Sequence, residues 1–227
     1  MKNALLILIL TGLLVSSTNA QVKIGLMGGM NFSTAYQQQF FFTDAGYKTK
    51  MLFGGIVDIQ LSRHISICLE PLYIEKGSER ENVLIGNITP NVSFDMSYFE
   101  IPILFKYSTG KYLRPYIVAG PAIGFNLGSD LSAGALGFEI GFDAGDYMRT
   151  VELSFDIGGG ISYEADDIIT FFVEAKYGFG LNDIVKHGNL RFDFADIHEW
   201  FTIPKNTRYN NRGLQLTFGF MLPLSAD

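Results

Sequence analysis

The sequence predicts an all-β protein, an eight-stranded antiparallel transmembrane β-barrel that follows a cleaved signal peptide. Eight segments alternate between apolar and polar residues, the signature of strands with one face in each environment. Long and short connections alternate between these segments, and the first 20 residues have the layout of an export signal. The 227-residue chain is 48% hydrophobic with a formal net charge of −6, which excludes a disordered tail and argues against a nucleic-acid partner.

The N-terminus reads as a secretory signal peptide. Lys2 supplies a positive charge, residues 4–15 form an apolar run, and residues 16–20 are small or polar, so we expect cleavage after Ala20. The run is shorter than the roughly 20 apolar residues of a spanning helix, and no run of that length follows it. We therefore expect a signal peptide at 1–20 and one barrel domain at 21–227.

The first four strands are expected at residues 22–33, 50–62, 65–74 and 92–108. The apolar set lies at even positions in the first segment and at odd positions in the next two. In the fourth segment the apolar residues are even-numbered up to Met96 and odd-numbered from Phe99. Such a change of phase predicts a β-bulge at Ser97 or Tyr98.

The last four strands are expected at residues 115–127, 151–163, 171–182 and 213–222. The cleanest alternation runs from Val151 to Tyr163, where apolar residues at odd positions face Glu, Ser, Asp and Gly at even ones. Gly158-Gly159-Gly160 resembles a phosphate-binding loop, but it lies inside this strand with no helix after it, which favours close packing in the lumen. Since Gly158 points inward, we expect a Gly158→Ser change to be milder than an arginine at a lipid-facing position such as Phe155 or Phe218.

The connections and the aromatic residues both suit an outer-membrane barrel. Residues 36–49, 77–90, 128–149 and 182–211 form long connections, whereas 62–64, 109–114 and 164–167 are short. An apolar band about 25 Å tall takes about 10 residues of each tilted strand, which these segments supply. Aromatic residues near the segment ends are typical of interfacial girdles: Tyr36, Phe40, Phe41, Phe42 and Tyr47 at one end, and Tyr107, Tyr112 and Tyr163 at the other.

The charged residues of the strands orient the two faces. A soluble, lipocalin-like barrel would have to hold many aromatic side chains inside, and eight strands leave no room for them. The polar face therefore points inward, as in barrels of OmpA or OmpX size, and carries a predicted lumen charge network of Asp58, Glu70, Glu100, Lys106, Glu152, Asp156, Glu174 and Lys176. Lys23, Lys76 or Arg212 near the rims can balance its excess of acids.

The sequence offers little catalytic or metal-binding chemistry. The last long connection holds five residues of metal-ligand type, namely His187, Asp193, Asp196, His198 and Glu199. No pair among them has the helical spacing of a His-x-x-x-His motif. No Gly-x-Ser-x-Gly elbow is present, and the single Cys68 lies on the inner face. We expect no catalytic residue, no cofactor and no metal.

The stretch Tyr98–Tyr107 (YFEIPILFKY) resembles the fourth strand of the Bacteroidota outer-membrane β-barrel domain, often called PorT-like. Residues 23–33, 70–73 with 76–77, and 114–116 with 119–121 resemble the same family in the same order. The resemblance implies an eight-stranded barrel in the cell outer membrane, mostly of unassigned function, with one branch that serves protein secretion. Such barrels often end on an aromatic residue, whereas here Phe220 is followed by residues 221–227.

Two classes of function remain open. The first is a structural or interaction scaffold with a filled lumen, which contacts partners through its long loops or its periplasmic face. The second is a membrane-surface enzyme of the lipid acyl hydrolase or transferase type, and a narrow porin is a third possibility. The expected partners are outer-membrane lipid, the barrel assembly machinery and other envelope or secretion proteins.

Overall fold

The computed structural model describes residues 21–37, 46–80, 91–135, 138–165, 168–186, 188–194, 197–203 and 208–224. The predicted signal peptide and the last three residues lie outside these ranges. The described elements, in chain order, are β1 (Gln21–Gln37), β2 (Gly46–Gln60), β3 (Ile65–Leu69), β4 (Leu72–Arg80), β5 (Asn91–Ser108), β6 (Leu113–Ala135), β7 (Phe138–Asp143), the 3-10 turn η1 (Gly145–Tyr147), β8 (Val151–Ala165), β9 (Ile169–Gly180), β10 (Gly188–Phe194), β11 (Ile197–Ile203) and β12 (Tyr209–Pro223). No helix within these ranges is long and apolar enough to cross a membrane.

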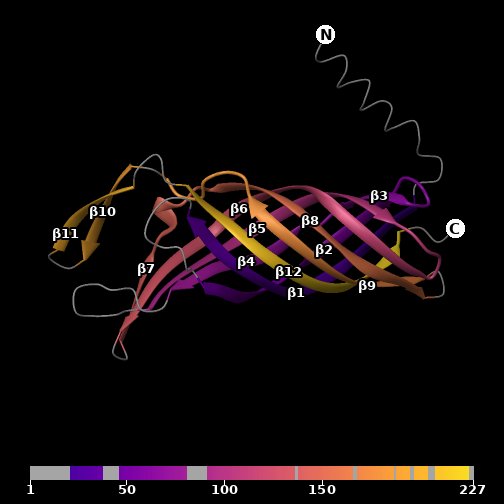
Figure 1. Cartoon of the computed structure of the whole chain (residues 1–227), viewed down its shortest axis with the longest axis horizontal. Helices are drawn as coiled ribbons and strands as arrows, with labels where there is room; N and C mark the ends of the chain where they lie inside the picture. Colours follow the sequence, from indigo (N-terminus) through magenta and orange to yellow (C-terminus); the bar gives the residue numbers. More distant parts are fainter. Residues whose placement is uncertain are drawn as a thin grey trace, which may run out of the picture.

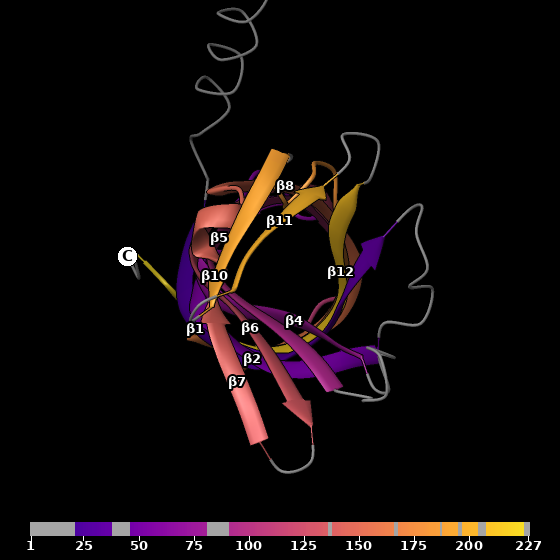
Figure 2. The same cartoon turned by 90° about the vertical axis from the view of Figure 1, so that its left-hand side faces the viewer.

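Eight antiparallel strands close into a ring, as the sequence predicts (Figure 2). The ring runs β1, β2, β3 with β4, β5, β6, β8, β9 and β12, and β12 pairs back to β1. β3 and β4 form a single barrel strand that is interrupted at Glu70 and Pro71, and both pair with β2 and β5. Hydrogen bonds from Gly55 to the Pro71 carbonyl (2.9 Å) and from Glu70 to the Pro102 carbonyl (3.1 Å) continue the pairing across the interruption.

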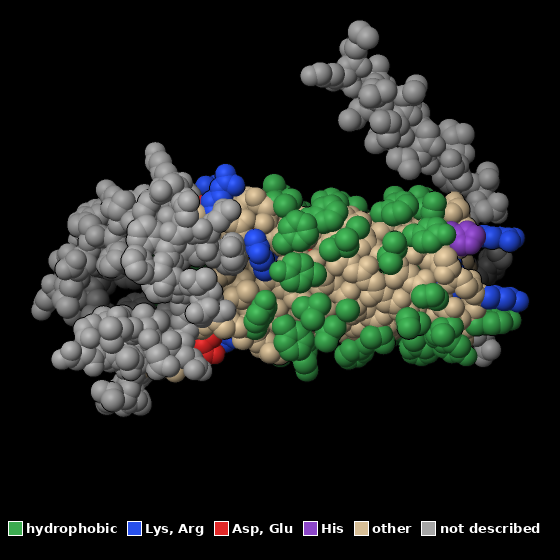
Figure 3. Space-filling view, in the orientation of Figure 1, with side chains coloured by type: hydrophobic (Ala, Val, Ile, Leu, Met, Phe, Trp, Pro, Cys, Tyr) green, Lys and Arg blue, Asp and Glu red, His purple; other side chains and the backbone are tan. Residues whose placement is uncertain are grey.

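The outer surface of the barrel is apolar. Outward positions carry large hydrophobic side chains, with Phe218, Val173 and Ile117 about two thirds exposed. Figure 3 shows such side chains over the middle of the barrel, with charged side chains near its two ends. An exposed apolar surface of this extent, which we call the belt, marks contact with a membrane. The predicted orientation of the two faces is confirmed.

The two ends of the barrel differ in how the strands are connected. At the turn end, residues 61–64, 109–112 and 166–168 join the strands, and β1 begins and β12 ends there (Figure 1). At the loop end, β5, β6 and β7 continue well past the belt, and β10 pairs with β11 as a separate hairpin. Strand therefore occupies parts of residues 128–149 and 182–211, which the sequence predicts as loops. In outer-membrane barrels the short turns are periplasmic and the longer connections extracellular.

The β-bulge is present, but it lies on the neighbouring strand. The register between β5 and β6 shifts from Ser97↔Gly128 to Tyr98↔Asn126, which leaves Leu127 of β6 unpaired. The faces of β5 keep alternating without a break, since Met96, Tyr98 and Glu100 are all buried. The apolar residues at even positions of β5 therefore belong to an apolar cluster inside the loop end. The bulge lies beside Ser97 and Tyr98, as predicted, but the extra residue is on β6 and not on β5.

Candidate functional site: the charged barrel interior

All eight residues of the predicted lumen charge network lie inside the barrel. Each occupies an inward position of its strand, and none is more than 8% exposed. Lysines connect seven of them into ion pairs. Within the described residues, Asp156 alone of the eight has no hydrogen-bond or ion-pair partner.

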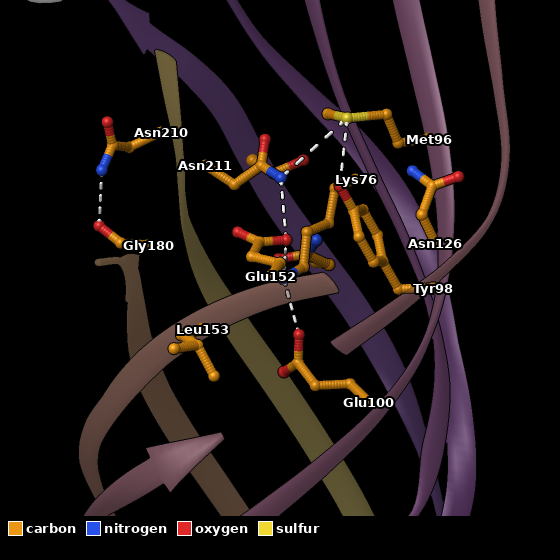
Figure 4. A network of polar contacts seen from close by, with 12 residues as sticks. Lys76, Met96, Tyr98, Glu100, Asn126, Glu152, Leu153, Gly180, Asn210 and Asn211 are labelled. Atoms are coloured by element: carbon orange, nitrogen blue, oxygen red, sulfur yellow. Dashed lines mark hydrogen bonds and ion pairs between the residues drawn. The ribbon is translucent and has the colours of Figure 1, made fainter. Parts of the chain in front are cut away.

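The loop-side cluster consists of Lys76, Glu100, Glu152, Asn211 and Tyr98. Lys76 Nζ lies 2.6 Å from Glu100 Oε2 and 3.2 Å from Glu152 Oε2, and 4.9 Å from the centre of the Tyr98 ring. The Asn211 amide donates a hydrogen bond to Glu152 Oε2 at 3.0 Å. Figure 4 shows these side chains converging from β4, β5, β8 and β12. One lysine thus neutralises part of the charge of two carboxylates and ties three strands together, and Asn211 joins the fourth through Glu152.

The central cluster consists of Lys176, Glu70 and Glu174. Lys176 is fully buried, contacts Glu70 Oε2, and lies 3.0 Å from Glu174 Oε1. Glu70 comes from the interruption between β3 and β4, whereas Glu174 and Lys176 share the inner face of β9. The cluster therefore joins strands from opposite parts of the ring.

Gly158 and Gly160 allow the strands around the central cluster to pack closely. A Cβ at Gly158 would lie 2.2 Å from the Ala175 carbonyl oxygen, and one at Gly160 would lie 2.6 Å from the Tyr116 hydroxyl. The close lumen packing inferred from the three glycines is confirmed. The obstacle at Gly158 is the backbone of the neighbouring strand, so Gly158→Ser should still lower stability, and its smaller effect than that of a lipid-facing arginine stays a prediction.

A third set of pairs lies towards the turn end. Lys106 Nζ lies 2.8 Å from Asp58 Oδ2 and 4.3 Å from the centre of the Tyr116 ring. Lys23 forms an ion pair with Glu164 and donates a hydrogen bond to Thr170 at 3.0 Å. Two of the lysines suggested as balancing charges, Lys23 and Lys76, thus have carboxylate partners.

Little open space is left between these side chains. Inside the described barrel, one cavity of about 30 Å³ lies at the turn end and one of about 10 Å³ lies in the loop-side half. Such volumes hold one or two water molecules. An interior of paired charges and small cavities is suited to rigid closure of the barrel.

Sequence reasoning missed several members of these clusters. Tyr98, Asn211, Glu164 and Thr170 all contact the charged residues. Each lies at an inward position, so the alternation of the strands is the signal that could have found them. Their specific partners depend on barrel closure, which brings together residues as far apart in sequence as Lys23 and Thr170.

The candidate metal ligands of the last long connection are placed only in part. His187 and Asp196 lie outside the described residues, and Asp193, His198 and Glu199 belong to the β10–β11 hairpin, in which Asp193 is paired with His198 along the backbone. Among the residues whose side chains are described, no group of three or more His, Cys, Asp or Glu is arranged to hold a metal. Cys68 is a buried free cysteine on the inner face.

A separate polar cluster lies on the outer side of the barrel beyond the belt. Lys48 and Lys50 lie 2.7 and 3.0 Å from the carboxylate oxygens of Asp95. Partial burial raises the pKa of Asp95, but hydrogen bonds from the two lysines outweigh it and hold the pKa below its usual value of 3.8.

Comparison with known proteins identifies the family. Residues 16–186 match the outer membrane protein beta-barrel domain. The chain belongs to this family. None of the curated proteins compared with the chain matches it.

Several solved outer-membrane barrels have a similar fold. OprG from Pseudomonas aeruginosa is 11% identical with a TM-score of 0.51, over 91% of this chain and 97% of OprG. Neisserial surface protein A is 9% identical with a TM-score of 0.43, over 88% and 96% of the two chains. Ail, the attachment invasion locus protein of Yersinia pestis, is 8% identical with a TM-score of 0.37, over 88% and 98%. The family match and the likeness to OprG indicate that the protein resides in the outer membrane. At these identities the likeness to solved structures concerns the fold alone.

Proposed function

We propose that this protein is a closed outer-membrane barrel that serves as a scaffold and presents its loop-end extension to other envelope proteins. The filled lumen is the observation that carries the proposal. The loop-side and central clusters bridge the barrel across its middle, and the cavities beside them hold one or two water molecules. A barrel closed in this way has its surfaces, rather than its interior, free for function.

The base of the loop-end extension is fixed to the barrel. The Arg149 N–H donates to the Ile184 carbonyl, and the Lys186 N–H donates to the Tyr147 carbonyl, both at 2.8 Å. Met148 and Ile184 are buried against the apolar cluster inside the loop end. These contacts hold the start of the segment that carries the β10–β11 hairpin, and the Ile184 N–H, which donates to the Tyr209 carbonyl at 3.0 Å, joins that start to the end of the segment. A held base favours a surface of defined shape for recognition.

The finer form of the proposal is an accessory role in protein secretion, which rests on the resemblance to the PorT-like branch. No specific observation favours the enzyme alternative. His64 is the one histidine whose side chain is described, and it lies at the turn end with its ring centre 6.1 Å from that of Tyr107. The porin alternative needs an open lumen, which the charge clusters oppose.

Replacing residues 188–203 with a short Gly–Ser linker tests the scaffold role. The barrel should still reach the outer membrane and show heat-dependent gel mobility, because the hairpin is a separate sheet. In a host strain that lacks the gene, the intact protein should restore secretion into the medium, and the shortened one, produced at the same level, should not. Full restoration by the shortened protein would contradict recognition through the hairpin, and unchanged secretion in the gene-deleted strain would contradict the secretion role.

A further inference from the structure

The charges in the middle of the barrel do not balance. Two lysines, Lys76 and Lys176, lie among five buried carboxylates: Glu70, Glu100, Glu152, Asp156 and Glu174. Four of the carboxylates share the two lysines. Asp156 is 1% exposed and has no hydrogen-bond or ion-pair partner within the described residues. Because an unpaired buried charge is strongly unfavourable, this part of the lumen should take up either a proton or a cation from solution.

A small cavity lies beside Asp156. It has a volume of about 10 Å³ and is lined by residues of β1, β4, β8, β9 and β12. Glycines on its wall keep it open. A Cβ at Gly178 would lie 2.7 Å from Asp156 Oδ1, and one at Gly180 would lie 3.1 Å from Glu152 Oε1. The space suits one particle of the size of a water molecule.

The wall of this cavity is rich in oxygen atoms without partners. The atoms that lack a hydrogen-bond partner are Glu152 Oε1, Ser154 Oγ, Asp156 Oδ2, Asn211 Oδ1 and Gln215 Oε1. All five residues are at most 4% exposed. A water molecule can donate only two hydrogen bonds and brings no charge. Carboxylate, amide and hydroxyl oxygens are the ligands that hard cations prefer.

We propose that the cavity beside Asp156 binds one monovalent alkali cation, Na⁺ or K⁺. Ca²⁺ takes about six to eight oxygen ligands, commonly with several carboxylates, whereas only two carboxylates line this space. Two cationic residues also line the cavity: Lys76, which already contacts Glu100 and Glu152, and Arg212, which occupies an exposed position of β12. The bound ion gives Asp156 a countercharge and links β8 to β12.

Heat unfolding of the refolded barrel in detergent tests the site. The midpoint is measured in NaCl, KCl and N-methyl-D-glucamine chloride at equal ionic strength, because the organic cation is too large for the cavity. We expect a midpoint several degrees higher with Na⁺ or K⁺, which rises with the logarithm of the ion concentration. Equilibrium dialysis with ²²Na⁺ should find one bound ion per barrel. Asp156→Asn should remove both effects.

Asp58→Asn is the matched control. It makes the same chemical change at the turn end, where Asp58 pairs with Lys106, and should lower the midpoint while keeping the alkali dependence and the bound ion. If Asp156→Asn does not fold, Gln215→Met keeps every charge and should weaken ion binding several-fold. Equal midpoints in Na⁺ and N-methyl-D-glucamine, or unchanged binding in the Asp156 or Gln215 variant, would overturn the proposal. A midpoint that responds to pH but not to alkali ions would assign a proton to Asp156 and overturn it as well.

Discussion

Replacing Lys176 with methionine removes the positive charge of the central cluster and keeps the length of the side chain. Lys176 is fully buried, and both of its partners, Glu70 and Glu174, are at most 3% exposed. The variant therefore leaves two carboxylates without their countercharge. Breaking a buried ion pair costs about 3–5 kcal/mol, because the remaining charge is uncompensated. We expect a loss of that size, which is a large part of the roughly 5–15 kcal/mol that stabilises a typical protein.

Urea unfolding in lipid bilayers, followed by circular dichroism and gel mobility, measures this loss. Lys111→Met is the matched control, since Lys111 lies exposed in the 109–112 turn and should change stability by no more than about 0.5 kcal/mol. Adding Glu70→Gln and Glu174→Gln to Lys176→Met should restore most of the stability, because it removes the stranded charges. The reasoning fails if Lys176→Met unfolds like the wild type, or if the triple variant is as unstable as the single one.

Three further variants probe the belt, the packing and the outer polar cluster. Phe218→Arg places a charge on the lipid-facing side and should lower the free energy of unfolding by about 2–4 kcal/mol. Tyr47→Arg at the loop end should lower it by at most about 1 kcal/mol. Equal losses in bilayer unfolding would contradict the assignment of the belt to the lipid. Gly158→Ala should destabilise the barrel by about 1–3 kcal/mol through its clash with β9, whereas Gly141→Ala, with open space around it, should not; similar urea midpoints would refute the packing argument. Because the pKa of Asp95 is lowered on folding, its ion pairs stabilise the folded barrel fully above pH 3.8. This contribution is about 1 kcal/mol or less, and it disappears as the pH falls through the folded-state pKa. Asp95→Asn should lack that acid-side decrease, and an identical pH profile of stability would count against it.

The alternation of residues predicts the strands well only where they cross the membrane. Residues 151–163 are found in β8 almost unchanged, because lipid outside and a polar lumen inside force a strict two-residue period. β6 runs to Ala135, eight residues past the predicted end, because beyond the belt nothing requires apolar residues to face outward. The bulge at Leu127 also changes which positions of β6 face inward, so the pattern fades there although the strand continues.

The contacts of the charged interior were likewise predictable only in part. The contact between Glu174 and Lys176 was foreseeable from their spacing of two on one strand. Lys176 and Glu70 lie 106 residues apart in the chain, and their contact depends on the stagger with which the ring closes. That Asp156 has no hydrogen-bond or ion-pair partner within the described residues was not predictable either. It depends on which lysines reach which carboxylates once the barrel has closed. The predicted signal peptide stays a prediction.

Conductance in planar bilayers tests the closed lumen most directly. If paired side chains fill the interior, the refolded protein gives no stable ohmic conductance, and Lys176→Met lowers stability without opening a defined channel. Reproducible channels from the wild-type protein, with an ion selectivity that changes in Glu174→Gln, would contradict the closed barrel.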